Sequence, residues 1–383
     1  MAASEQHTAR SLFTLQPNPP PDTSTQQPWE LAVSVTGVNP PPTSTLERMQ
    51  HWYNHRPPRQ SLNGTVLLFY KYCRISQPQQ LLEWQTKLCK LLRIRGRLHV
   101  GAEGLNGTLG GSQEAVQLYI EALQTHCVWA HYFADTDIKT SPGGHHCFPN
   151  LYVRLCTEIC QMNASPELIH WDDCCQHLTP TEFHAQVQQH VGCAAPGSPG
   201  SEKNDTHSNT AVLLDVRNLY ESEVGHFDNA VCLPTRHFTD FPAVADQLIE
   251  QLNLRDKKVF MYCTGGIRCE RASAYLRSKG VQECFQLQGG IHNYVEELGA
   301  ASLFRGKNFV FDRRLTTERV GTTQPMGKCV VCQALHDEYN KNISCSGCSC
   351  LVLLCDGCCD VCMVDQKLNK ELLCGMCAAL EDT

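Results

Sequence analysis

The chain has 383 residues, of which 24 are cysteine, and its formal net charge is −7. A negative charge excludes a globally basic nucleic-acid coat but leaves room for a local basic face. The length predicts about two to three domains. Eleven cysteines lie between Cys329 and Cys377, which predicts a large ordinary region followed by a small one held together by metal ions or disulfides.

Residues 1–60 are predicted to form a disordered arm. Ten of the 20 prolines lie there, and proline tracts remove backbone donors and favour extended chain. The first residues lack the layout of an export signal, and no apolar run approaches the about 18–20 residues that span a bilayer. We therefore expect a cytoplasmic protein, with the nucleus as an alternative and no membrane partner.

Residues 61–165 are predicted to form a ferredoxin-like α+β domain, because the order strand, helix, strand, strand, helix, strand is the split βαβ pattern. Residues 166–210 are predicted to be a connector and flexible linker, since they include Gly197-Ser-Pro-Gly-Ser and lack apolar periodicity near it. In the first domain we expect strands at about 65–72, 97–100, 108–109 and 151–155, and helices at about 79–92 and 112–123.

Residues 211–304 are predicted to form an α/β domain with a parallel sheet and helices on both faces. The runs Ala211–Val216 and Lys258–Cys263 are almost continuously apolar, as strands buried on both faces require. We expect shorter strands at 231–234 and 284–287 and helices at about 241–252, 268–279 and 290–298.

Cys263 is the candidate catalytic residue of this domain. It ends a buried strand and is followed by the loop Thr264–Ile267, by Arg268 and by a helix. Unpaired N–H groups and the helix dipole stabilise an anion at such a position. Gly265 and Gly266 let the amides, including that of Ile267, form an anion nest, and Arg268 adds a cation. We expect a lowered pKa and a nucleophilic thiolate; the alternative is an inert buried cysteine.

This loop resembles the active-site loop of rhodaneses, and the similarity covers about residues 205–300. Upstream, Leu214–Arg217, Tyr220-Glu221 and Gly225–Ala230 lie where rhodaneses carry their D-x-R, Y-E and G-H-I-x-G-A signatures. The resemblance implies that Cys263 carries a persulfide. Four residues separate Cys263 from Arg268, whereas related cysteine phosphatases have five, so phosphatase activity is disfavoured.

Three neighbouring residues have accessory roles with alternatives. Asp215 and Arg217 are interpreted as a structural ion pair, and the alternative is a catalytic role. Cys269, directly after Arg268, either resolves a persulfide or disulfide on Cys263 or packs in the core.

Longer motifs resemble the bacterial tRNA uridine hydroxylases, rhodanese-containing enzymes that oxygenate the wobble uridine to 5-hydroxyuridine. The motifs are Gly101–Thr108, Cys263–Glu270 and Lys307–Arg314, and the similarity covers about 63–360. It implies a tRNA partner, although the proline-rich arm and the C-terminal end depart from the bacterial pattern. Glu103 and Asn106 either face the catalytic pocket across a domain interface or form a turn.

A basic run supports an RNA partner. Its five cations lie within eleven residues and no acid interrupts them. Phosphate contacts need such a patch, and the alternative is a solvated helix face. The residues are Lys87, Lys90, Arg93, Arg95 and Arg97.

After a connecting segment at 305–324, residues 325–383 are predicted to form a zinc module. Four Cys-x-x-Cys pairs suit two structural zinc ions, because four thiolates leave no open position on each metal; disulfides are the alternative. One interleaved site would use Cys329, Cys332, Cys355 and Cys358. The other would use Cys345, Cys350, Cys374 and Cys377, since the Cys-x4-Cys spacing of the resembling family favours Cys350 over Cys348.

The sequence therefore predicts an enzyme that uses Cys263 in tRNA wobble-uridine modification. One alternative is a sulfurtransferase that takes sulfur from thiosulfate or a persulfide donor and passes it to a small thiol. A second alternative is a non-catalytic module that binds RNA or protein.

Overall fold

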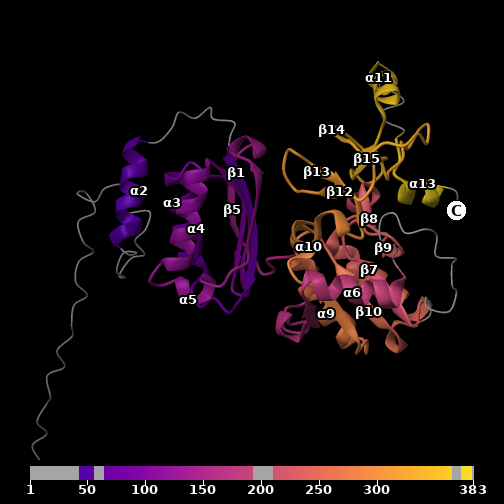
Figure 1. The fold of residues 1–383 in the computed structure, drawn as a ribbon, viewed down its shortest axis with the longest axis horizontal. Coiled ribbons are helices and arrows are strands. Elements are labelled where there is room, and N and C mark those ends of the chain that lie inside the picture. The colour runs from indigo at the N-terminus through magenta and orange to yellow at the C-terminus, as the bar shows by residue number, and fades with distance from the viewer. Residues whose placement is uncertain (1–42, 56–63, 193–209, 365–371, 382–383) are drawn as a thin grey trace, which may run out of the picture.

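The computed structural model describes residues 43–55, 64–192, 210–364 and 372–381. Most of the predicted arm lies outside these residues, as do residues 193–209 of the predicted connector and linker. Figure 1 shows an N-terminal domain (64–155), a middle domain (176–298) and a C-terminal module (304–381). Among the described residues, none of the helices combines the length and hydropathy needed to cross a membrane.

The N-terminal domain is a five-stranded sheet with the strand order β4-β1-β3-β2-β5. Strands β4, β1, β3 and β2 pair antiparallel, in the order of the ferredoxin-like fold that the sequence predicts. The elements are β1 (Gly64–Tyr72), α3 (Pro78–Leu91), β2 (Arg95–Gly101), β3 (Gly104–Gly111), α4 (Gln113–Thr125), α5 (Ala130–Phe133), β4 (Ile138–Gly143) and β5 (Leu151–Leu155).

The two faces of this sheet have different roles. Leu67 and Phe69 of β1 are fully buried and pack in a core with Trp84 of α3. Because side chains alternate along a strand, Leu68 and Tyr70 lie on the opposite face. Figure 1 shows α3 and α4 on the side of the sheet away from the middle domain, so the uncovered face is turned toward that domain.

The strand predicted at 151–155 is confirmed, but its predicted place in the ferredoxin-like order is wrong. We expected it to be the fourth strand, but the strand that completes the ferredoxin-like order is β4 at 138–143, which pairs with β1. Residues 151–155 form β5, an edge strand that runs parallel to β2. Strand β4 is Ile-Lys-Thr-Ser-Pro-Gly, and such a polar edge strand has no hydrophobic alternation to reveal it.

The predicted disordered arm contains a helix, α2 (Thr43–His55). Met49 and Trp52 are buried, and the Thr45 hydroxyl donates to Glu121 of α4 at 2.8 Å. Positions 45, 49 and 52 share one face of a helix. The proline content upstream concealed this periodicity.

As predicted, the middle domain is built on a parallel sheet; its strand order is β6-β11-β10-β7-β9. Its first two elements, β6 and α6, come from the stretch that was predicted to be a connector, and both extend the domain. The elements are β6 (Gln176–Leu178), α6 (Pro180–Val191), β7 (Ala211–Asp215), α7 (Leu219–Glu223), β9 (Ala230–Cys232), α8 (Phe241–Gln251), β10 (Lys258–Tyr262), α9 (Ile267–Ser278), β11 (Cys284–Leu287) and α10 (Gly290–Leu298).

Alternation along the strands divides this domain into two cores. Val259 and Met261 of β10 pack with α8 and α9, whereas Phe260 and Tyr262 pack with α6 and α10. Both faces of the central strand are therefore apolar, which explains its unbroken hydrophobic sequence.

The C-terminal module joins the middle domain through a shared sheet with the order β13-β12-β8. A two-stranded sheet and two helices follow, and most of the clustered cysteines lie in the turns next to these elements. The elements are β8 (Gly225–Phe227), β12 (Phe304–Phe309), β13 (Thr316–Val320), β14 (Tyr339–Ser344), β15 (Leu351–Leu353), α11 (Asp356–Val364) and α13 (Gly375–Glu381).

Candidate functional site

Cys263 lies between the end of β10 and the start of α9, and its side chain is fully buried. The N–H of Gly266 donates to its Sγ at 3.1 Å. Burial by itself raises the pKa of this thiol. The neighbouring Cys269 thiol, the Arg268 guanidinium and the loop amides outweigh burial and lower the pKa to about 5. A thiol with this pKa is a thiolate at neutral pH, and the thiolate is the nucleophilic form.

Arg268 is held by a carboxylate that sequence reasoning did not single out as a site residue. Its guanidinium donates to both carboxylate oxygens of Glu221, at 2.6 and 2.8 Å, and to the Thr264 hydroxyl at 3.2 Å. Glu221 is fully buried. Such a bidentate pair fixes the orientation of a guanidinium. The Tyr-Glu signature was the available signal for this residue.

Asp215 and Arg217 form a fully buried ion pair. The Arg217 Nε donates to Asp215 at 2.8 Å, and the hydroxyls of Ser222 and Tyr262 donate to the same carboxylate at 2.9 Å. The pair ties the end of β7 to β10 and α7.

Cys269 is fully buried in the core that also contains Cys263. Burial raises its pKa well above the ordinary value, and contact with Cys263 adds to this effect. Cys269 is therefore a protonated neighbour of the Cys263 thiolate.

The N-terminal domain packs directly on the Cys263 loop. A methyl group placed on Gly265 would lie 3.0 Å from Leu68, and one on Gly266 would lie 2.7 Å from the Tyr70 hydroxyl. Gly266 also has a φ of +102°, which disfavours other residues. The two glycines thus permit the close approach of β1.

A cavity of about 520 Å³ lies where the two domains meet, and Cys263 is part of its lining. This volume is in the range of small-molecule sites. Five cations and a single acid line it. Three of the cations pair with carboxylates, Arg268 with Glu221, Lys139 with Asp137 and Arg314 with Asp312, and two have no carboxylate partner among the described residues. The cavity is therefore suited to an anionic or polar ligand. The cations are Arg97, Lys139, Arg154, Arg268 and Arg314.

Strands β2 and β3 give the cavity a polar wall opposite the loop. His99 faces Asn106 across the strand pair, and both line the cavity together with Thr108. Burial and the nearby Arg154 lower the pKa of His99 to about 4, so its ring is neutral at neutral pH. Of Glu103 and Asn106, which were predicted either to face the catalytic pocket or to form a turn, only Asn106 lines the cavity. Glu103 instead accepts a hydrogen bond from Arg271 of α9 at 3.2 Å.

The predicted basic patch is divided by the fold. Lys87 and Lys90 lie on α3, which covers the sheet face opposite the cavity, and Arg93 lies in the turn after it. Arg95 and Arg97 lie on β2, and of the five residues only Arg97 lines the cavity. A run that is continuous in sequence therefore reaches both sides of the domain.

Behind the loop, a hydrogen-bond network joins the two domains through Glu270. This carboxylate accepts from the Tyr70 hydroxyl at 2.9 Å, and it contacts His177 at 2.9 Å and Gln286 at 3.0 Å. Together with Cys174, this pair of His177 and Glu270 places three potential metal-ligand atoms within 4.8 Å of one another.

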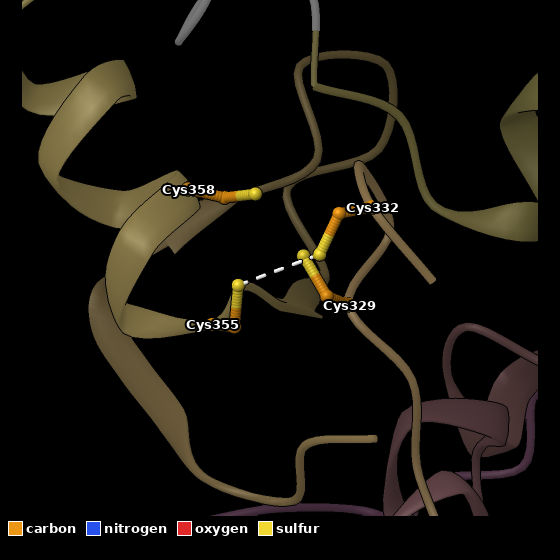
Figure 2. A group of neighbouring side chains, drawn as sticks. All are labelled: Cys329, Cys332, Cys355 and Cys358. Carbon is orange, nitrogen blue, oxygen red and sulfur yellow. Dashed lines mark hydrogen bonds between the residues drawn. The ribbon is translucent and has the colours of Figure 1, made fainter. Parts of the chain in front are cut away.

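The C-terminal module contains two clusters that could each hold a metal ion. The thiols of Cys329, Cys332, Cys355 and Cys358 point toward one another in Figure 2, and the Sγ atoms of Cys332 and Cys355 are 3.5 Å apart. A tetrahedral site with bonds of ~2.3 Å separates sulfurs by ~3.8 Å, so this spacing fits. This first cluster has the predicted ligand set.

The second cluster corrects the prediction, because it contains Cys348 and not Cys350. Its members are Cys345, Cys348, Cys374 and Cys377, and the Sγ atoms of Cys348 and Cys374 are 3.7 Å apart. A tight turn at Ser349, with a φ of 62°, reverses the chain, and the backbone of Cys350 pairs with that of Cys345. The Cys350 thiol contacts the Arg236 carbonyl instead.

A cysteine at the carboxyl end of a central parallel strand, beside an arginine at the start of the next helix, defines a rhodanese-fold protein. Family comparison agrees: residues 199–297 match the rhodanese-like domain, residues 64–159 the UPF0176 acylphosphatase like domain, and residues 305–378 the rhodanase C-terminal region. The chain belongs to the tRNA uridine(34) hydroxylase family.

Three relatives support this assignment. A tRNA uridine(34) hydroxylase of Corynebacterium diphtheriae is 33% identical over 76% of this chain and 90% of its own length, and that of Cytophaga hutchinsonii is 34% identical over 73% and 80%. Rhodanese-like domain-containing protein 6 of Arabidopsis thaliana is 35% identical over 76% of this chain. The chain spans only 50% of the Arabidopsis protein.

Proposed function

We propose that this protein hydroxylates the wobble uridine of tRNA and that Cys263 is its essential residue. The observation that carries the proposal is the cavity between the domains, where a thiol with a pKa of about 5 meets a wall from the N-terminal domain. The names of the relatives supply the substrate and the reaction.

The polar wall suits a uracil ring. Uracil presents one N–H donor and two carbonyl acceptors. The neutral imidazole of His99, the amide of Asn106 and the hydroxyl of Thr108 offer both donors and acceptors. The cations Arg97 and Arg154 have no carboxylate partner among the described residues, which leaves them available to the phosphates of the nucleotide.

The Cys263 thiolate acts as a nucleophile toward C6 of the ring. As the Sγ–C6 bond forms, the C5–C6 π electrons move to O4, and the cavity cations stabilise the resulting enolate. C5 then attacks the outer oxygen of a hydroperoxide, and the O–O bond breaks to release an alkoxide. The alkoxide takes the C5 proton, and expulsion of the thiolate restores Cys263 and leaves 5-hydroxyuridine and an alcohol.

The two cysteine clusters are proposed to hold structural Zn²⁺. Four thiolates saturate a tetrahedral ion and leave no position for a reactant. The ions would fix the C-terminal module against the middle domain, where Arg236 contacts Cys377 at 3.4 Å.

A second candidate function is sulfur transfer from a persulfide on Cys263. The four-residue loop between Cys263 and Arg268 favours it, because such a short loop suits sulfur. Purified protein would then carry sulfur that cyanide removes, and the Cys263→Ser variant would carry none.

The test of the main proposal is a comparison of tRNA nucleosides from cells with and without the protein, measured by mass spectrometry. We expect the deficient cells to lose 5-hydroxyuridine or a derivative of it at the wobble position. An unchanged nucleoside profile would refute the hydroxylase proposal and leave sulfur transfer as the better candidate.

A further inference from the structure

A second cavity of about 500 Å³ adjoins the Cys263 cavity. The two share five lining residues, among them Arg97, His237 and Phe311. All three parts of the protein build the second cavity: Phe148 comes from the segment before β5, Tyr220 from α7, and Lys341 from β14 of the C-terminal module. The two cavities are therefore adjacent and share one wall.

The charge of the second cavity points to an anionic ligand. Arg97, Arg313 and Lys341 are exposed and line it, and in the described part of the chain none of the three forms an ion pair. Its acid, Asp312, is held by Arg314 through both carboxylate oxygens. Solvated cations without carboxylate partners are the groups that contact phosphates.

Phe311 gives the shared wall an aromatic surface. Its side chain is 41% exposed although it lies next to the buried Phe309. The Arg268 guanidinium lies 5.6 Å from its ring centre, which restrains the ring over the active-site loop. A restrained, exposed aromatic ring beside cations is the combination that binds unpaired bases by stacking.

We propose that the second cavity binds the nucleotide next to the target uridine in a single-stranded RNA loop. Its base stacks on Phe311, and the adjoining phosphates contact Arg97, Arg313 and Lys341. The C-terminal module is then part of the RNA-binding site and not only a structural support. The inference rests on the proposed function and names the part of the tRNA that the site recognises.

The test measures the affinity of the full-length protein for a fluorescent anticodon stem-loop RNA over a series of salt concentrations. We expect Lys341→Gln and Arg313→Gln each to weaken binding several-fold and to reduce the salt slope by about one. We expect Phe311→Ala to weaken binding about fivefold or more with an unchanged salt slope.

Two control variants match these changes. Lys90→Gln removes one exposed cation on α3, on the far side of the sheet, and Val331→Ala removes an exposed apolar side chain of the C-terminal module outside both cavities. Both should bind as the wild type does. Metal content and the unfolding curve of each variant establish that it is folded. If Phe311→Ala unfolds, Lys341→Gln still tests the inference, because it changes an exposed side chain.

Two outcomes overturn the inference. If Lys341→Gln and Arg313→Gln bind the RNA as Lys90→Gln does, the second cavity is not a nucleotide site, while the hydroxylase proposal stands. If the wild type does not bind the RNA, the inference fails too, and the nucleoside comparison then decides the proposed function separately.

Discussion

The protein stabilises cysteine thiolates in two different ways. In the C-terminal module, four thiols converge within 4.8 Å in each cluster, and four like charges at that spacing need a dication to hold them. At the Cys263 loop, one thiolate is stabilised by the neighbouring Cys269 thiol, by the Arg268 guanidinium and by loop amides such as the N–H of Gly266. Here the protein itself supplies the positive charge, so the sulfur stays available for reaction.

The largest expected effect concerns the second cluster. Cys348→Ala should lower the zinc content from two ions to one per chain and unfold the C-terminal module, because the binding of a structural zinc contributes on the order of 10 kcal/mol to such folds. Cys350→Ala should keep both ions, since its thiol lies outside the cluster. Metal analysis by plasma mass spectrometry decides whether Cys348 or Cys350 is the ligand. Loss of zinc from Cys350→Ala and not from Cys348→Ala would support the ligand set with Cys350 that the sequence predicts.

The packing of the N-terminal domain on the loop gives the next effect. Arg271 is fully buried and pairs with Glu103 and Glu158 across the domain boundary. Arg271→Gln leaves these carboxylates buried without a cation and should lower the free energy of unfolding by about 3 kcal/mol. Denaturant unfolding measures it. The control is Arg255→Gln, which breaks an exposed ion pair and should lower the free energy of unfolding by under about 1 kcal/mol. Equal losses of unfolding free energy in the two variants would contradict a stabilising role of the buried Arg271 pairs.

The smallest effect tests the charge at the loop directly. The thiolate form of Cys263 exists above its pKa of about 5, so its alkylation by iodoacetamide should slow as the pH falls through that value. Arg268→Gln removes the cation and should raise the pKa by about one unit, which slows alkylation roughly tenfold at about pH 4 but only about twofold at about pH 6. Mass spectrometry of the Cys263 peptide follows the rate, and Arg277→Gln on the same helix should leave it unchanged. An unshifted profile in Arg268→Gln would show that Arg268 does not stabilise the thiolate.

Features that depend on local sequence could be predicted. The strand, loop and helix around Cys263 are contiguous, so their geometry follows from backbone rules. Strands β7, β10 and β11 and helices α8, α9 and α10 of the middle domain follow from apolar runs in the same way, whereas β6 and α6 were not predicted. The first cysteine cluster follows from paired Cys-x-x-Cys spacing.

Features that depend on tertiary contacts could not be predicted from the sequence. His99 and Arg154 reach the cavity only because β2 and β5 pair and turn one face toward the middle domain. The choice of Cys348 depends on the turn at Ser349, which spacing does not reveal. Strand β4 lies at an edge and is polar, and its partner β1 is about 70 residues away in the chain.

The most direct test of the central claim uses cells that lack the protein and re-express it either unchanged or as Cys263→Ser, followed by mass spectrometry of their tRNA nucleosides. The unchanged protein should restore the modified wobble uridine. The Cys263→Ser protein should not restore it, although its metal content stays the same. Restoration by Cys263→Ser would contradict the account, because the chemistry would then not depend on the thiolate at the loop.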